Sequence, residues 1–90
     1  MSRYDIYRLA LDSYGPEAQT LLMMEEMSEL QKELCKNARG SHNRDAIAEE
    51  IADVLIMLEQ MMILHQCSSV VGVMKEMKLQ RLRERLGVAP

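Results

Sequence analysis

Ninety residues allow one small domain, and abundant Leu, Met, Glu and Ala without any Phe or Trp are typical of a helical protein. The formal net charge of −3, with both signs mixed along the chain, argues against a binder of nucleic-acid polymers, which would carry a basic excess. No apolar run approaches the roughly 18–20 residues that cross a bilayer, so a membrane protein is not expected.

Helical spacing of apolar residues is visible along nearly the whole chain. The first helix is predicted over about 4–14, and Gly15 ends it. Pro16 suits the first turn of a second helix that reaches residue 37 or 38. The residues expected to face inward are Ile6, Leu9 and Ala10 in the first helix and Met23, Met27, Leu30 and Leu34 in the second.

The segment RGSHNR, residues 39–44, is predicted to be a loop, with Asn43 or Asp45 as the cap of a third helix that continues to about residue 64 or 66. Apolar side chains surround nearly the whole circumference of this third helix. Such a helix is buried on all sides, which one copy of so short a chain cannot easily provide. We therefore expect a homodimer, or a homotetramer built as a dimer of dimers, with this helix in the shared core.

A fourth helix is predicted to start at Ser68 or Ser69 and to end near Leu86, where Gly87 stops it. Four helices and no strand pattern predict an all-α fold. We expect an antiparallel helical bundle that forms a single domain over 1–90 and is completed by homodimerisation.

The number and spacing of the cysteines indicate whether the protein works in a reducing or an oxidising compartment. Cys35 and Cys67 are isolated thiols without CxxC spacing, whereas a small secreted scaffold would carry more cysteines. Residues 1–15 also lack the charged-then-apolar pattern of a signal peptide. A reduced, cytoplasmic protein is therefore expected.

Two pairs of carboxylates occur at spacing i, i+3: Glu26 with Glu29 in the second helix, and Glu50 with Asp53 in the third. Residues three apart lie on the same helix face, so each pair projects together. If the two helices form an antiparallel hairpin, Glu29 and Glu50 fall at similar distances from the loop and the pairs converge. Four carboxylates this close repel one another unless divalent cations neutralise them.

Oxygen ligands alone favour a hard cation, Mg²⁺ with Mn²⁺ as a substitute. A di-iron bundle would use Glu-x-x-His, and neither His42 nor His65 follows a Glu at that spacing. A single Glu pair is more often a solvated helix face, as is expected of Glu33 and Glu59. Two pairs on neighbouring helices leave the metal site and the solvated face as equal alternatives from the pattern alone.

The acidic segments resemble a known family. EEMSE at 25–29, followed after a gap by EEIAD at 49–53, is similar to the EExxE…ExxD signature of the all-α nucleoside triphosphate pyrophosphohydrolases, the MazG-like group. The flanking segments GPEAQ, ELCKNARG, EEIADVLIMLEQM and KLQRLRERL agree with it. The likeness covers about 14–86, the core of the expected domain.

This resemblance implies a helical dimer, or a dimer of dimers, that uses Mg²⁺ to hydrolyse nucleoside triphosphates to the monophosphate and pyrophosphate. The implied metal ligands are Glu26, Glu29, Glu50 and Asp53. Either Glu29 or Glu50 would orient or deprotonate the attacking water. The implied substrate contacts are Lys36, Arg39, Lys78 and Arg81 to phosphate and Gln19 to the base.

Each of these four cations is equally compatible with a solvated surface. The tyrosines Tyr4, Tyr7 and Tyr14 are the aromatic side chains that could stack on a base, and each is equally a core candidate.

The sequence therefore predicts a Mg²⁺-dependent pyrophosphohydrolase that clears surplus or non-standard (deoxy)nucleoside triphosphates. The main alternative is a non-catalytic oligomerisation or regulatory module on the same helical bundle. A metal-storing carboxylate bundle is disfavoured because Glu-x-x-His is missing.

Overall fold

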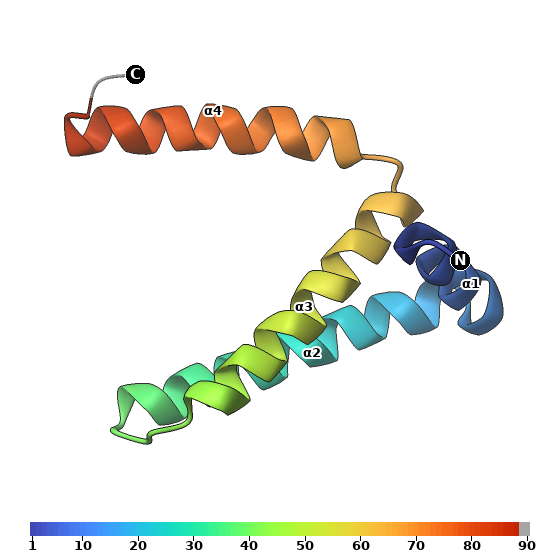
Figure 1. Ribbon diagram of the computed structural model, residues 1–90, viewed down its shortest axis with the longest axis horizontal. Helices are drawn as coiled ribbons and strands as arrows, with labels where there is room; N and C mark the ends of the chain where they lie inside the picture. Colours follow the sequence, from blue (N-terminus) through green and yellow to red (C-terminus); the bar gives the residue numbers. More distant parts are fainter. Residues whose placement is uncertain (89–90) are drawn as a thin grey trace.

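The computed structural model describes residues 1–88 and contains four helices, with no strand in that range. The predicted all-α fold is confirmed, and the helix ends lie within about two residues of those expected, which is the usual uncertainty of such bounds. In Figure 1, α2 and α3 form a long antiparallel hairpin, α1 packs at its open end, and α4 departs from the end of α3. The helices are α1 (Arg3–Tyr14), α2 (Pro16–Ala38), α3 (Arg44–Leu64) and α4 (Ser68–Leu86).

Local capping chemistry explains where the helices begin and end. The Ser2 hydroxyl accepts a hydrogen bond from the Asp5 amide at 3.1 Å, and the Asp5 carboxylate accepts one from the Ser2 amide at 2.9 Å, which forms a capping box. Gly15 has a positive φ of 92°, which a side chain would disfavour, and it separates α1 from Pro16. Gly87 ends α4 in the left-handed conformation, as predicted.

The loop between α2 and α3 is held by side chains rather than by a conventional cap. Asn43 is the N-cap residue of α3, but its side chain makes no capping hydrogen bond. It donates instead to the Glu33 backbone carbonyl at 2.8 Å and to the Glu33 carboxylate at 3.1 Å. Lys36 also pairs with Glu33 at 3.2 Å. The expectation that Glu33 is an ordinary solvated residue is therefore wrong, because the loop folds Asn43 back onto it.

Helix α1 is rotated relative to the prediction. Tyr7 and Leu11 are buried, whereas Ile6 and Leu9 are 54% and 52% exposed. The Tyr7 hydroxyl donates to Glu59 on α3 at 3.3 Å, and Glu59 also pairs with Arg3 at 3.5 Å. The expected inward positions Ile6 and Leu9 are wrong, as is the expected solvated role of Glu59, because this contact turns the Tyr7 face of α1 toward α3.

The core of a single copy is thin. On α2, Met23 is buried, but Met27 and Leu34 of the expected inner stripe are exposed. Helix α4 contacts only α3 among residues 1–88, and it contributes no buried residue. No helix in the described part of the chain is both long and apolar enough to cross a membrane. The buried apolar side chains are Tyr7, Leu11, Met23 and Met57.

Candidate metal centre

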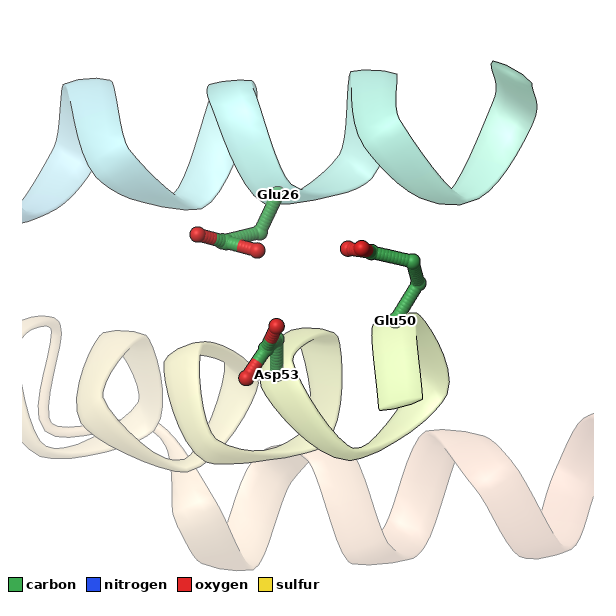
Figure 2. A group of neighbouring side chains, drawn as sticks. All are labelled: Glu26, Glu50 and Asp53. Carbon is green, nitrogen blue, oxygen red and sulfur yellow. The ribbon is translucent and has the colours of Figure 1, made fainter. Parts of the chain in front are cut away.

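Three of the four predicted carboxylate ligands meet in the seam between α2 and α3. Figure 2 shows Glu26 projecting from α2 toward Glu50 and Asp53, which project from α3. One carboxylate oxygen from each residue lies within 4.8 Å of the others, and all three side chains are half-buried. Oxygen atoms at this spacing can share one cation.

Helix geometry explains this convergence. Glu50 and Asp53 are three residues apart and therefore share one face of α3. The antiparallel hairpin places Glu26 opposite that face. Glu29, the fourth predicted ligand, is exposed and lies outside this group of three. It is nevertheless close enough for its charge to contribute to the raised pKa values of Glu26 and Glu50.

The electrostatics of the cluster are unfavourable without a cation. Partial burial raises the pKa of Glu26, and the negative charges of Asp53 and Glu50 raise it further. The pKa of Glu50 is raised in the same way, first by burial and then by the charges of Asp53 and Glu29. A bound divalent ion would reverse this trend, because its positive charge favours the ionised carboxylates.

A single atom of Glu50 gives independent support for a ligand. Its Oε2 oxygen is buried and has no hydrogen-bond partner. An acceptor that is withdrawn from water without a partner is unfavourable, so such an atom calls for a cation or a donor. The donor set of three carboxylates and no nitrogen or sulfur fits Mg²⁺ or Mn²⁺, which keep water or phosphate oxygens in their remaining positions.

A cavity of about 280 Å³ adjoins the cluster, and Glu26 and Asp53 form part of its wall. Gln19 of α2 and Gln60 of α3 also line it, with exposed fractions of only 4% and 5%. The Gln60 carbonyl oxygen has no hydrogen-bond partner. The exposed ring of Tyr14 forms another part of the wall. The space beside the acids thus combines apolar walls with amide groups, as small-molecule sites commonly do.

Gln60 is the site residue that the sequence analysis missed. It follows Asp53 by seven residues, which is two helical turns, so the two side chains share a face of α3. The sequence pattern that could have identified Gln60 is a polar amide in a mostly apolar helix, on the same face as the acidic pair. Gln19 was predicted, and it does line the cavity.

The predicted phosphate-binding cations do not gather at the acids in a single copy. Lys36 pairs with Glu33 near the loop, ten residues and therefore roughly 15 Å along α2 from Glu26. Arg39 is exposed at the end of α2. Lys78 and Arg81 are exposed on α4, which contacts neither α1 nor α2 within residues 1–88.

The tyrosines separate into different roles. Tyr7 belongs to the core and binds Glu59. Tyr4 packs edge-on against Tyr7, with ring centroids 6.1 Å apart, and the Arg3 guanidinium lies over the Tyr4 ring at 5.4 Å. Of the three, Tyr14 is the one that lines the cavity beside the acids.

Comparisons of the chain with protein-family models, with curated proteins and with solved structures find no match.

Proposed function

We propose that the chain is a Mg²⁺-dependent hydrolase that converts (deoxy)nucleoside triphosphates to the monophosphate and pyrophosphate. The observation that carries this proposal is the group formed by Glu26, Glu50 and Asp53, whose oxygens converge within 4.8 Å beside a cavity. The buried Oε2 atom of Glu50, which has no hydrogen-bond partner, also supports the proposal. The resemblance of the two acidic segments to the pyrophosphohydrolase signature supplies the reaction class.

These three carboxylates would hold the ion, with Glu29 at the exposed margin. When bound, Mg²⁺ would offset the negative charge of the triphosphate and polarise the phosphorus under attack. In the reaction, water adds to phosphorus, the bond between the α-phosphate and the bridging oxygen to the β-phosphate breaks, and pyrophosphate leaves. One proton of the water passes to a carboxylate. Either Glu29 or Glu50 would accept it: Glu50 belongs to the group that would hold the ion, and Glu29 lies at its exposed margin.

The cavity next to the acids would receive the nucleoside. Gln19 and Gln60 can present amide groups to a base edge, and the unpartnered Gln60 carbonyl requires a donor such as an amino group or a ring N–H. Tyr14 can stack on the base from the open side. The proposed phosphate contacts are still Lys36, Arg39, Lys78 and Arg81, and because they lie away from the acids of their own copy, a second copy would have to bring them to the phosphates.

The proposed working form is a homodimer or homotetramer in the cytoplasm, where non-standard or surplus nucleotides would be cleared. Both cysteines are free thiols, which fits a reducing compartment. The second candidate function is a non-catalytic oligomerisation module. The observation in its favour is the large apolar surface that one copy exposes.

A substrate panel tests the proposal. Purified protein is incubated with ribo-, deoxy- and oxidised nucleoside triphosphates with and without Mg²⁺, and released pyrophosphate is measured. We expect metal-dependent release that Asp53→Asn abolishes and that Glu25→Gln, a neighbouring exposed acid on α2, retains. If folded protein releases no pyrophosphate from any nucleotide of the panel, the non-catalytic module is favoured.

A further inference from the structure

The cavity beside the acids ends in a pair of amide side chains. Gln19 lies seven residues before Glu26 on α2, and Gln60 lies seven residues after Asp53 on α3. Seven residues make two helical turns, so each glutamine shares the face of its acid and lies roughly 10 Å further along the helix. Because α2 and α3 run antiparallel (Figure 1), both steps lead away from the loop and toward α1. The two glutamines therefore form the end of the cavity that is remote from the acids.

Both amides are withdrawn from solvent, in surroundings that offer them little. Gln19 and Gln60 are 4% and 5% exposed, and the Gln60 carbonyl oxygen has no hydrogen-bond partner. A seam that needed only packing would be better served by an apolar side chain of similar shape at this position. An unpartnered, buried amide at the end of a cavity thus indicates a ligand that supplies a donor. The rest of the cavity wall, apart from the two acids, consists of Ala10, Tyr14, Leu22, Ile56 and Met57.

We propose that this end of the cavity selects nucleotides whose base carries an amino group at the edge farthest from the sugar, as cytosine and adenine do. Their carbonyl counterparts, uracil and hypoxanthine, are rejected. Gln60 is the residue that determines this specificity, because its carbonyl oxygen accepts a hydrogen bond from the amino group. This selection deepens the proposed hydrolysis and rests on it, because it requires the phosphates to lie at the acids.

The distance between the acids and the amides decides which part of the nucleotide meets Gln60. With the phosphates at Glu26 and Asp53, the sugar and the base extend along the two helical turns toward Gln19 and Gln60. The group that arrives first at the end of the cavity is the substituent on the far edge of the base. That substituent is an amino group, a donor, in cytosine and adenine, and a carbonyl oxygen, an acceptor, in uracil and thymine.

A base carbonyl at this place would set two acceptors against each other and leave both without a donor. A site built around a buried polar group discriminates strongly against a substrate that leaves the group unpaired. Turning the Gln60 amide over would bury two N–H donors in place of one carbonyl oxygen, and a base carbonyl in line with them pairs with only one. The ring N–H of uracil lies beside its carbonyl groups, so using it would press one of them against the apolar wall. Deaminated nucleotides are therefore expected to be poor substrates.

Two matched pairs of substrates test this selection. CTP and UTP differ in having an amino or a carbonyl group at the far edge of the base, and so do ATP and ITP. We expect kcat/KM for pyrophosphate release with Mg²⁺ to be at least about tenfold higher for the amino member of each pair. Discrimination in one pair alone would keep the amino group as the selected feature and add a limit on ring size. Ratios near one, or in favour of the carbonyl member, in both pairs would overturn the proposal.

Gln60→Met assigns the preference to this residue. We expect the ratio of kcat/KM between CTP and UTP to fall close to one, because methionine cannot accept the hydrogen bond from the amino group. A merely structural role would lower kcat/KM for both nucleotides equally and leave the ratio unchanged. Gln31→Met, at an exposed position on α2, is the matched control and should keep the ratio of the unmodified protein. A full preference for CTP in folded Gln60→Met would show that another group recognises the base.

A binding measurement on the unmodified protein separates the base preference from hydrolysis and covers the case in which Gln60→Met fails to fold. Isothermal titration calorimetry with CMP and UMP needs no turnover, and we expect CMP to bind at least about tenfold more tightly. If CMP binds more tightly but no triphosphate is hydrolysed, the proposed reaction is wrong and the amino-base site stands. Equal binding of CMP and UMP, or no binding of either, would overturn the site even if triphosphates are hydrolysed.

Discussion

Glu26 on α2 and Asp53 on α3 present their carboxylates to each other across the seam of the hairpin (Figure 2). Partial burial, and then the negative charge of Asp53, raise the pKa of Glu26. The two residues are far apart in the chain and come from different helices. Their approach would be repulsive if both were ionised, so the hairpin holds a charge arrangement that a cation would stabilise.

Asp53→Asn should separate function from folding. We expect it to lower Mg²⁺-dependent pyrophosphate release more than about a hundredfold, because loss of a ligand costs at least as much as loss of a supporting residue. The melting temperature of the metal-free protein should rise, because one of the facing negative charges is removed. Activity assays and thermal melts of the variant and of Glu25→Gln check this. A fall in stability with normal turnover would mean that Asp53 is structural.

Divalent ions should stabilise the folded protein even without nucleotide. A ligand that binds only the folded state at a hundred times its Kd contributes about 2.7 kcal/mol. We expect Mg²⁺ or Mn²⁺ to raise the melting temperature of the unmodified protein and to leave that of Asp53→Asn unchanged, at constant ionic strength. An equal response of both proteins would indicate screening rather than a site at these carboxylates.

The stability of the metal-free protein should depend on pH through Glu26 and Glu50. Their pKa values are raised above the ordinary 4.5, so the folded state binds these protons more tightly than the unfolded chain. The resulting stability is fully present at or below pH 4.5 and is lost as the pH rises through the folded-state pKa values.

Melting curves from pH 4.5 to 7.5 in a chelating buffer test the direction of this pH dependence of stability. We expect the unmodified protein to melt at higher temperature toward the acidic end of the range. The double variant Glu26→Gln with Glu50→Gln should show a weaker dependence. The pKa values of Asp5 and Glu33 are lowered, so these two groups stabilise the folded state more as the pH rises. Their contribution changes below pH 4.5 for Glu33 and at still lower pH for Asp5. A double variant with the same slope would contradict the assignment.

Gln60→Met tests whether the unpartnered side-chain carbonyl of Gln60 accepts a hydrogen bond from a ligand. Removing a buried acceptor without a partner relieves a cost of about 1–3 kcal/mol, and methionine has a similar shape, so the free protein should become slightly more stable. The KM for the preferred nucleotide should rise if Gln60 contacts the base. Gln31→Met, at an exposed position on α2, is the control and should change neither quantity. Strong destabilisation by Gln60→Met would mean that the carbonyl has a structural partner.

Tyr7→Phe should loosen α1 without changing its helical content. It removes the hydroxyl that donates to Glu59 at 3.3 Å, a bond worth about 0.5–1.5 kcal/mol. A loss of that size lowers the melting temperature by a few degrees in a domain of this length. Tyr14→Phe, at a largely exposed ring, should melt like the unmodified protein. Equal melting of Tyr7→Phe and the unmodified protein would show that the α1–α3 contact rests on apolar packing alone.

The sequence by itself determined the helices and the acidic pairs. Helix bounds follow from local chemistry: Pro16 in a first turn, Gly15 and Gly87 at positive φ, and apolar residues at helical spacing. The i, i+3 spacing places Glu50 beside Asp53 wherever that segment is helical. Such features involve neighbours within about one turn, so they can be found without knowing how the helices pack.

Tertiary structure alone decided which helix faces meet. The rotation of α1 toward Tyr7, the return of Asn43 to Glu33 and the place of Gln60 beside the acids depend on how whole helices cross. The exposure of Glu29, outside the group formed by Glu26, Glu50 and Asp53, has the same origin. Spacing along one helix fixes the angles between its own side chains, but it does not fix the rotation of that helix against its neighbours. That rotation is set by the sum of contacts between residues distant in the sequence.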